Sequence, residues 1–295
     1  MEQEIINKLK EKGLKDKSIK LYITILKNLN DKREIKNFKF LEKPKKILDK
    51  IKGYKLTTQR NILIAIVSTL KNLGNDLYKS YYDYMMEFNN KIEDNNKNGE
   101  KSEQQKENWI KWDEVENKFN ELNKNIKLSK NISESQFDNI LDAVILGLYV
   151  LIPPRRNKDY LNMKVSKDGK NLDDKYNWVN MKNKQFIFND YKTSGTYGKQ
   201  IIDVGNDLID LLKKYLKYKK DGDGYLLVKF SGERLKSDNS ITRRLNKIFG
   251  KNISSSMLRH IYLTDKYCKV NEEMKKDSEI MGHNLKMQKE YIKND

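Results

Sequence analysis

Residues 91–107 form a polar stretch, KIEDNNKNGEKSEQQKE, in which Ile92 is the only large apolar side chain. Because burial of apolar surface drives folding, such a segment cannot contribute a face to a core. It therefore divides the 295 residues into two parts, each long enough to bury its own core. We expect an N-terminal domain over residues 1–90, a polar linker over 91–107 and a second domain over 108–295.

The N-terminal part predicts a small helical bundle of roughly four helices. Apolar residues recur there with a helical period behind possible capping residues, and one such pattern stops at Gly74, a good helix terminator. The expected helices begin near Asp16 or Ser18, after Pro44, at Thr57 or Thr58, and near Leu77.

The second part predicts a mainly helical domain with a small antiparallel β-sheet. Helices are expected over residues 113–126 and 134–152, the latter ended by Pro153 and Pro154, with a short helix following. Three short β-rich runs come next, and helices resume near residue 206. The expected strands cover residues 176–181, 185–189 and 200–204. The fold class is therefore mainly α with a small antiparallel sheet, α+β.

The charge is strongly positive, with 60 Lys and Arg against 42 Asp and Glu, a formal net charge of +18. Such a chain attracts polyanions, of which nucleic acid is the commonest, although an AT-rich coding sequence, a ribosome or a membrane surface also fits. A single cysteine, Cys268, excludes an internal disulfide and a cysteine-based zinc site. The acidic start and the lack of a long apolar run predict an intracellular protein without a membrane span.

Two segments supply arginines in a recognisable pattern. Cleaving a phosphodiester without a metal requires a nucleophile, cations for the nonbridging oxygens and an acid for the leaving oxygen, and guanidinium groups suit the second role. The segment RNKDYLNMK resembles the first arginine motif of the phage integrase family, the tyrosine recombinases, with Arg156 in the catalytic place. Asp159 then lies one helical turn on, where it can orient the guanidinium. Tyr160 departs from the family's leucine, and Arg155 is the competing choice.

The segment SSSMLRH resembles the family's His-x-Leu-Arg-His box, which makes Arg259 the second phosphate-binding arginine. Ser256 stands where the family has its first histidine, so the resemblance leaves it only the role of a hydroxyl donor. His260 points about 100° away from Arg259 on a helix, and we expect a structural role for it.

The remaining catalytic candidates lie near the C-terminal end of the sequence and in the loop of the expected β-hairpin. Met281-Gly282-His283 resembles the family's Leu-Gly-His box, and Tyr291 takes the place of the nucleophile, eight residues on instead of the usual nine. That interval requires a turn between them. Lys192, in the loop after the second expected strand, resembles the family's general acid, with Lys199 as the alternative.

The resemblance covers residues 150–293 and implies a site-specific recombinase or integrase that forms a 3′-phosphotyrosine intermediate without metal or cofactor. It implies double-stranded DNA as partner, a homotetramer on paired sites and a core-binding-like N-terminal domain. Residues Arg243, Arg244 and Lys247 are candidates for DNA contact on a helix that family members lay in the major groove. A type IB topoisomerase or a DNA-binding protein with a decayed site are the alternatives. The composition also resembles viral or mobile-element integrases.

Overall fold

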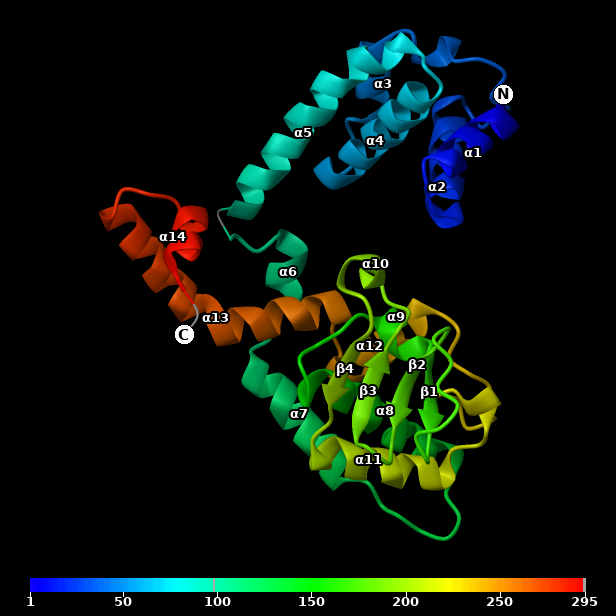
Figure 1. The fold of residues 1–295 in the computed structure, drawn as a ribbon, viewed down its shortest axis with the longest axis vertical. Coiled ribbons are helices and arrows are strands. Elements are labelled where there is room, and N and C mark those ends of the chain that lie inside the picture. Colours follow the sequence, from blue (N-terminus) through cyan, green and yellow to red (C-terminus); the bar gives the residue numbers. More distant parts are fainter. Residues whose placement is uncertain (98, 294–295) are drawn as a thin grey trace. The chain divides into compact units, whose positions relative to one another are not determined.

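The computed structural model describes residues 1–97 and 99–293, and it divides into two compact units, Met1–Lys101 and Ser102–Asp295. The boundary falls inside the polar stretch of residues 91–107. Among the described residues, no helix is long and apolar enough to cross a membrane. Figure 1 shows both units, which we describe separately.

The first unit is entirely helical in its described residues. Its core is formed by one stripe of each helix, such as Ile19, Ile23 and Leu26. A first helix was not expected from the sequence, yet it contributes the fully buried Ile5 and Leu9. The elements are α1 (Glu2–Glu11), α2 (Asp16–Leu29), η1 (Lys39–Leu41), α3 (Pro44–Ile51), α4 (Leu56–Asn72), η2 (Asp76–Tyr78) and α5 (Lys79–Lys97).

The second unit is helical around one small sheet, which confirms the predicted fold class. Its N-terminal helices are α6 (Glu103–Asn108), α7 (Trp112–Lys124), α8 (Glu134–Val150) and α9 (Asn157–Leu161). The middle holds β1 (Met163–Ser166), β2 (Asn177–Asn180), β3 (Gln185–Phe188), α10 (Ser194–Tyr197) and β4 (Gln200–Asp203). The C-terminal part holds α11 (Asn206–Tyr218), η3 (Gly222–Gly224), α12 (Asp238–Phe249), α13 (Ser255–Ile280) and α14 (Leu285–Tyr291).

The sheet has four strands in the order β1-β2-β3-β4, and it is mixed, not wholly antiparallel. The three expected strands pair antiparallel, with Phe186 opposite both Val179 and Ile202. The added strand, β1, pairs parallel with β2. It was not expected because it is only four residues long and follows α9 almost directly, so its sequence carries little periodicity.

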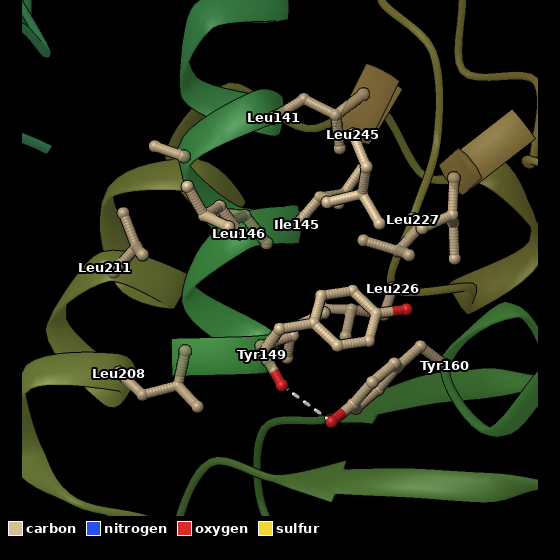
Figure 2. Close-up of a cluster of buried hydrophobic side chains, with 14 of the residues drawn as sticks. Leu141, Ile145, Leu146, Tyr149, Tyr160, Leu208, Leu211, Leu226, Leu227 and Leu245 are labelled. Atoms are coloured by element: carbon tan, nitrogen blue, oxygen red, sulfur yellow. Dashed lines mark hydrogen bonds between the residues drawn. The ribbon is translucent and has the colours of Figure 1, made fainter. Parts of the chain in front are cut away.

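Helix α8 is the central element of the second unit. Helices α7, α11 and α12 all pack against it, and its residues from Ile140 to Tyr149 are buried throughout. Figure 2 shows Leu211 of α11 on the side of Leu146 of α8 and Leu245 of α12 on another side. A helix that is apolar on every side belongs in a core, and α8 therefore fixes the positions of the elements around it.

Tyr160 occupies the position where the resembled motif has leucine, and the structure gives the reason. Its ring packs edge-on against Tyr149, Phe186 and Phe188, and it is fully buried. Its hydroxyl donates a hydrogen bond to the Leu148 carbonyl at 2.7 Å, near the end of α8 (Figure 2). The tyrosine thus fills the core and pairs a carbonyl of a helix terminus.

Replacing Tyr160 by Phe should therefore destabilise the second unit by about 1–3 kcal/mol, because a buried carbonyl loses its donor while the packing is kept. Urea unfolding of the full chain measures the change. Tyr197→Phe, at an exposed tyrosine, is the control and should leave the free energy of unfolding unchanged. Equal stability of the two variants would contradict this role of the hydroxyl.

Candidate active site

Arg156 and Arg259 line one cavity of about 260 Å³ in the second unit. Arg156 is the N-cap residue of α9, in an extended conformation, and Arg259 lies in the first turns of α13. The β3–β4 hairpin closes a further side of the cavity. The complete lining is Pro154, Arg155, Arg156, Asp159, Tyr191, Thr193, Tyr197, Gln200 and Arg259.

The surroundings of the Arg259 guanidinium disfavour its positive charge. Its Nη2 donates to the Ser256 hydroxyl at 3.1 Å, while its buried Nε has no hydrogen-bond partner within the described part of the chain. Burial lowers the pKa of Arg259, and the positive charge of Arg156 lowers it further. Two like charges therefore face one cavity, which an anion in that cavity would stabilise.

Asp159 offsets only part of this positive charge. Its side chain is 2% exposed, and its Oδ2 accepts a hydrogen bond from Arg155 Nε at 3.0 Å. Its Oδ1 is buried and has no partner among the described residues. Burial raises the pKa of this carboxyl, although Arg155 and then Arg156 oppose the shift. One carboxylate thus serves a cavity that three arginines line.

A buried hydrogen-bond network fixes the start of α9, next to the cavity-lining Arg156. The Tyr149 hydroxyl donates to Asn157 Oδ1 at 2.7 Å, and Asn157 Nδ2 donates to the Asp238 carbonyl and to Thr242 Oγ1. Burial raises the pKa of Tyr149 well above its ordinary value, so its hydroxyl remains a donor. Because Asn157 directly follows Arg156, the network ties the start of α9 to α8 and α12.

A second buried asparagine, Asn177, fixes the start of the β3–β4 loop. Its Nδ2 donates to the carbonyls of Asp159 and Asp190, and its Oδ1 accepts from the backbone of Asn189 and Asp190. It thereby joins α9 to the loop. Sequence patterns did not indicate this residue, because asparagines are abundant in the chain and its partners are distant in sequence.

The loop itself carries the lysine candidates. Lys192 is exposed between Tyr191 and Thr193, both of which line the cavity. Lys199 forms an exposed ion pair with Asp174 at 3.4 Å, so Lys192 is the better candidate for chemistry. Thr193, Tyr197 and Gln200 also line the cavity, although no sequence motif indicates a role for their side chains.

His283 and Tyr291 lie apart from this cavity, on the hairpin formed by α13 and α14. Their rings meet edge-on with centroids 5.5 Å apart, across a turn in which Asn284 caps α14. From Leu263 to Asp277 every α13 side chain except that of Met274 is exposed. Figure 1 shows α14 beside the far end of α13. At about 1.5 Å per residue, the helix extends up to about 30 Å beyond Arg259.

The structure thus brings Arg156, Arg259 and Ser256 together and pairs His283 with Tyr291, but it leaves these two groups separate. The short interval from His283 does not prevent the ring contact, because the turn absorbs the change of direction. His260, for which a structural role was expected, is exposed. Among the described residues, no group of three or more His, Cys, Asp and Glu side chains is placed to hold a metal ion.

The candidate DNA-contacting residues on α12 have different environments. Arg243 is exposed. Arg244 is 17% exposed and donates to Asp142 at 2.6 Å and to Asp138 at 2.7 Å, so its charge is used inside the domain. Lys247 is exposed and pairs with Asp142 at 3.5 Å. Arg243 is therefore the strongest of the three candidates for binding a phosphate.

Comparison with known proteins adds a distant similarity at the level of the fold. No protein-family model matches the chain, and no curated protein matches it either. Among solved structures, the crystal structure of XerA recombinase aligns with a TM-score of 0.38 and 14% identity, over 100% of this chain and 93% of that chain. A score at this level carries no argument about activity, and the proposals below depend on the site itself.

Sulfate should stabilise the protein through the cavity. At tenfold above its Kd it should add about 1.4 kcal/mol, raising the Tm of the second unit by about 4 °C. Arg259→Met should abolish that increment, because one of the two cations is lost. Thermal unfolding at constant ionic strength measures both, with Lys213→Met as an exposed-cation control. An undiminished increment in the Arg259 variant would rule out this anion site.

Replacing Arg244 should lower the free energy of unfolding much more than replacing Arg243. Arg244→Met should cost about 3–5 kcal/mol of unfolding free energy, because it leaves the buried Asp142 without its closest cation. Arg243→Met should change stability by no more than about 0.5 kcal/mol. Urea unfolding compares the two neighbours directly, and similar losses in both variants would refute the assignment.

Proposed function

We propose that this protein cleaves and rejoins DNA strands through a phosphotyrosine ester, as a site-specific recombinase or integrase. The observation that carries the proposal is the cavity that Arg156 and Arg259 both line, together with a single carboxylate, Asp159, which is paired with Arg155. Such a cavity suits the two nonbridging oxygens of a phosphodiester, which become more negative as the phosphorus gains a fifth bond.

The reaction assigns one role to each candidate. The Tyr291 oxygen forms a bond to phosphorus and loses its proton to solvent, while the bond from phosphorus to the 5′ oxygen breaks. Lys192 donates a proton to that leaving oxygen, which becomes a hydroxyl. Arg156 and Arg259 hold the nonbridging oxygens, Ser256 supports Arg259, and His283 accompanies the tyrosine. Attack of a 5′ hydroxyl on the phosphotyrosine reverses the step and reseals DNA.

Tyr291 must reach the cavity for this reaction. The hairpin of α13 and α14 is suited to move, because the outer half of α13 has few buried side chains between Ile261 and Ser278. The tyrosine then comes either from the same chain or from a second copy bound to the same DNA. A tetramer on paired sites, which the sequence resemblance implies, would provide such copies.

Double-stranded DNA is the proposed substrate, and the net charge of +18 favours its binding. Replacing Arg243 by Ala should reduce the slope of log Kd against log salt by about one, because one phosphate contact is lost. Fluorescence anisotropy on duplex DNA measures that slope. An unchanged slope would exclude Arg243 from the DNA interface.

The nucleophile can be tested without knowing the target sequence. A pool of randomised duplexes with a nick at one fixed position traps the covalent adduct wherever a cleavable sequence lies beside the nick, because the short cleaved strand diffuses away. The parent chain should form an adduct that maps to Tyr291, and Tyr291→Phe should form none. Arg259→Lys should cleave about 10²-fold more slowly. Tyr267→Phe, at another exposed tyrosine of α13, is the matched control.

The same experiment separates the competing functions. An adduct on Tyr291→Phe would reject Tyr291 as nucleophile. If the parent forms no adduct, the protein binds DNA without cutting it, and the separation of Tyr291 from the arginine cavity gives the reason. Relaxation of supercoiled plasmids that lack the selected sequence would instead favour a type IB topoisomerase.

A further inference from the structure

Arg155 makes four side-chain contacts although it stands next to the proposed catalytic Arg156. Its Nε donates to Asp159 Oδ2 at 3.0 Å and its Nη1 donates to Gln200 Oε1 at 3.0 Å. The guanidinium carbon lies 3.8 Å from the centre of the Phe188 ring and 5.3 Å from that of Tyr191. Only 17% of this side chain is exposed. The guanidinium is thus used both as a hydrogen-bonding fork and as a flat face.

Three of the four partners of Arg155 come from elements that surround one loop, and the fourth, Tyr191, lies in that loop. Phe188 is the last residue of β3 and Gln200 is the first residue of β4, so these two bracket residues 189–199. Asp159 belongs to α9, the helix whose N-cap residue is Arg156. A single side chain therefore connects both ends of the loop that carries Lys192 to the helix that begins at Arg156.

We infer that Arg155 is a positioning residue that holds the loop 189–199 against α9 and so sets the place of Lys192 relative to Arg156. This inference rests on the proposed function for its catalytic consequence, but not for the restraint of the loop. Within the loop, the Tyr191 hydroxyl donates to the Gly198 carbonyl at 2.6 Å, and Asp190 near its start accepts hydrogen bonds from Asn162 and Asn177. The Tyr191 bond closes the loop on itself and Asn177 holds its first two residues, whereas Arg155 joins α9 to Tyr191 and to Gln200 at the far end of the loop.

Lysine at position 155 cannot replace these contacts. An ammonium group directs three donors from one point and has no flat face, so it cannot bridge Asp159 and Gln200 while stacking on Phe188. Arg155→Lys therefore keeps the charge and removes the connection. It separates a role in geometry from a role in electrostatics.

The chemical consequence concerns the leaving oxygen. With the loop displaced, Lys192 no longer delivers its proton as the bond from phosphorus to the 5′ oxygen breaks, and the step slows. A substrate with sulfur in the 5′ bridging place needs no such proton, because a thiol with a pKa of about 8.5 leaves readily as thiolate. A defect that acts through Lys192 therefore shrinks on the sulfur substrate.

The first test needs no DNA. Hydrogen exchange followed by mass spectrometry on the full chain should show amides of residues 191–199 exchanging about tenfold faster in Arg155→Lys, with other peptides unchanged. Gln200→Leu, which removes one partner and keeps the side-chain volume, should give a smaller change in the same peptide. Lys213→Arg, at an exposed lysine of α11, is the control. Unchanged exchange in both variants would overturn the inference.

The second test uses single-turnover cleavage of nicked duplexes. Arg155→Lys should cleave the ordinary ester about 10²-fold more slowly than the parent, and the sulfur ester within about threefold of it, with DNA affinity unchanged. An equal defect on both esters would overturn the connection to Lys192. If the parent itself cleaves neither ester, the proposed function fails, and the exchange experiment still decides whether Arg155 holds the loop.

Discussion

The repulsion between Arg156 and Arg259 is the constraint on which the candidate site depends. Two cations facing one half-buried cavity oppose folding, so the domain must hold both helices by other interactions. Buried contacts hold them: hydrogen bonds of Asn157 join α9 to α8 and α12, and the buried Leu258 anchors the start of α13 in the core. The free energy of core packing thus maintains an arrangement that only an anion relieves, which makes the cavity ready for a phosphate.

The sequence predicted the elements around the site better than the contacts inside it. Helix α8 and the hairpin of β3 and β4 could be predicted because their patterns are local, with a long apolar run in one and turn residues in the other. Arg156 and Arg259 could be selected together because the segments that carry them resemble two family motifs and occur in the same order as those motifs. Gln200, Asn177 and Tyr197 could not, because no local pattern marks them and their roles arise only from long-range contacts.

The position of Tyr291 has a physical reason that no motif expresses. The motif places the tyrosine close to His283 in sequence, and the two rings do meet. What connects them to the arginine cavity is a helix whose outer half buries almost no apolar surface, so little free energy fixes its direction. The tyrosine is also 62% exposed, so its phenol lies largely in water. As the proposed nucleophile, Tyr291 would react only where a substrate brings it to the two arginines.

Arg155 and Arg156 show how one carboxylate assigns different roles to neighbouring residues of equal charge. Asp159 gives one oxygen to Arg155, which is then fixed between aromatic rings, and this leaves Arg156 without a full counter-ion. Were Asp159 paired with Arg156 instead, the cavity would be closer to neutral and its attraction for an anion weaker. The choice of partner follows from geometry, because the extended backbone at Arg156 separates the directions of the two side chains. The ion pair that restrains the loop therefore also preserves the charge of the proposed phosphate site.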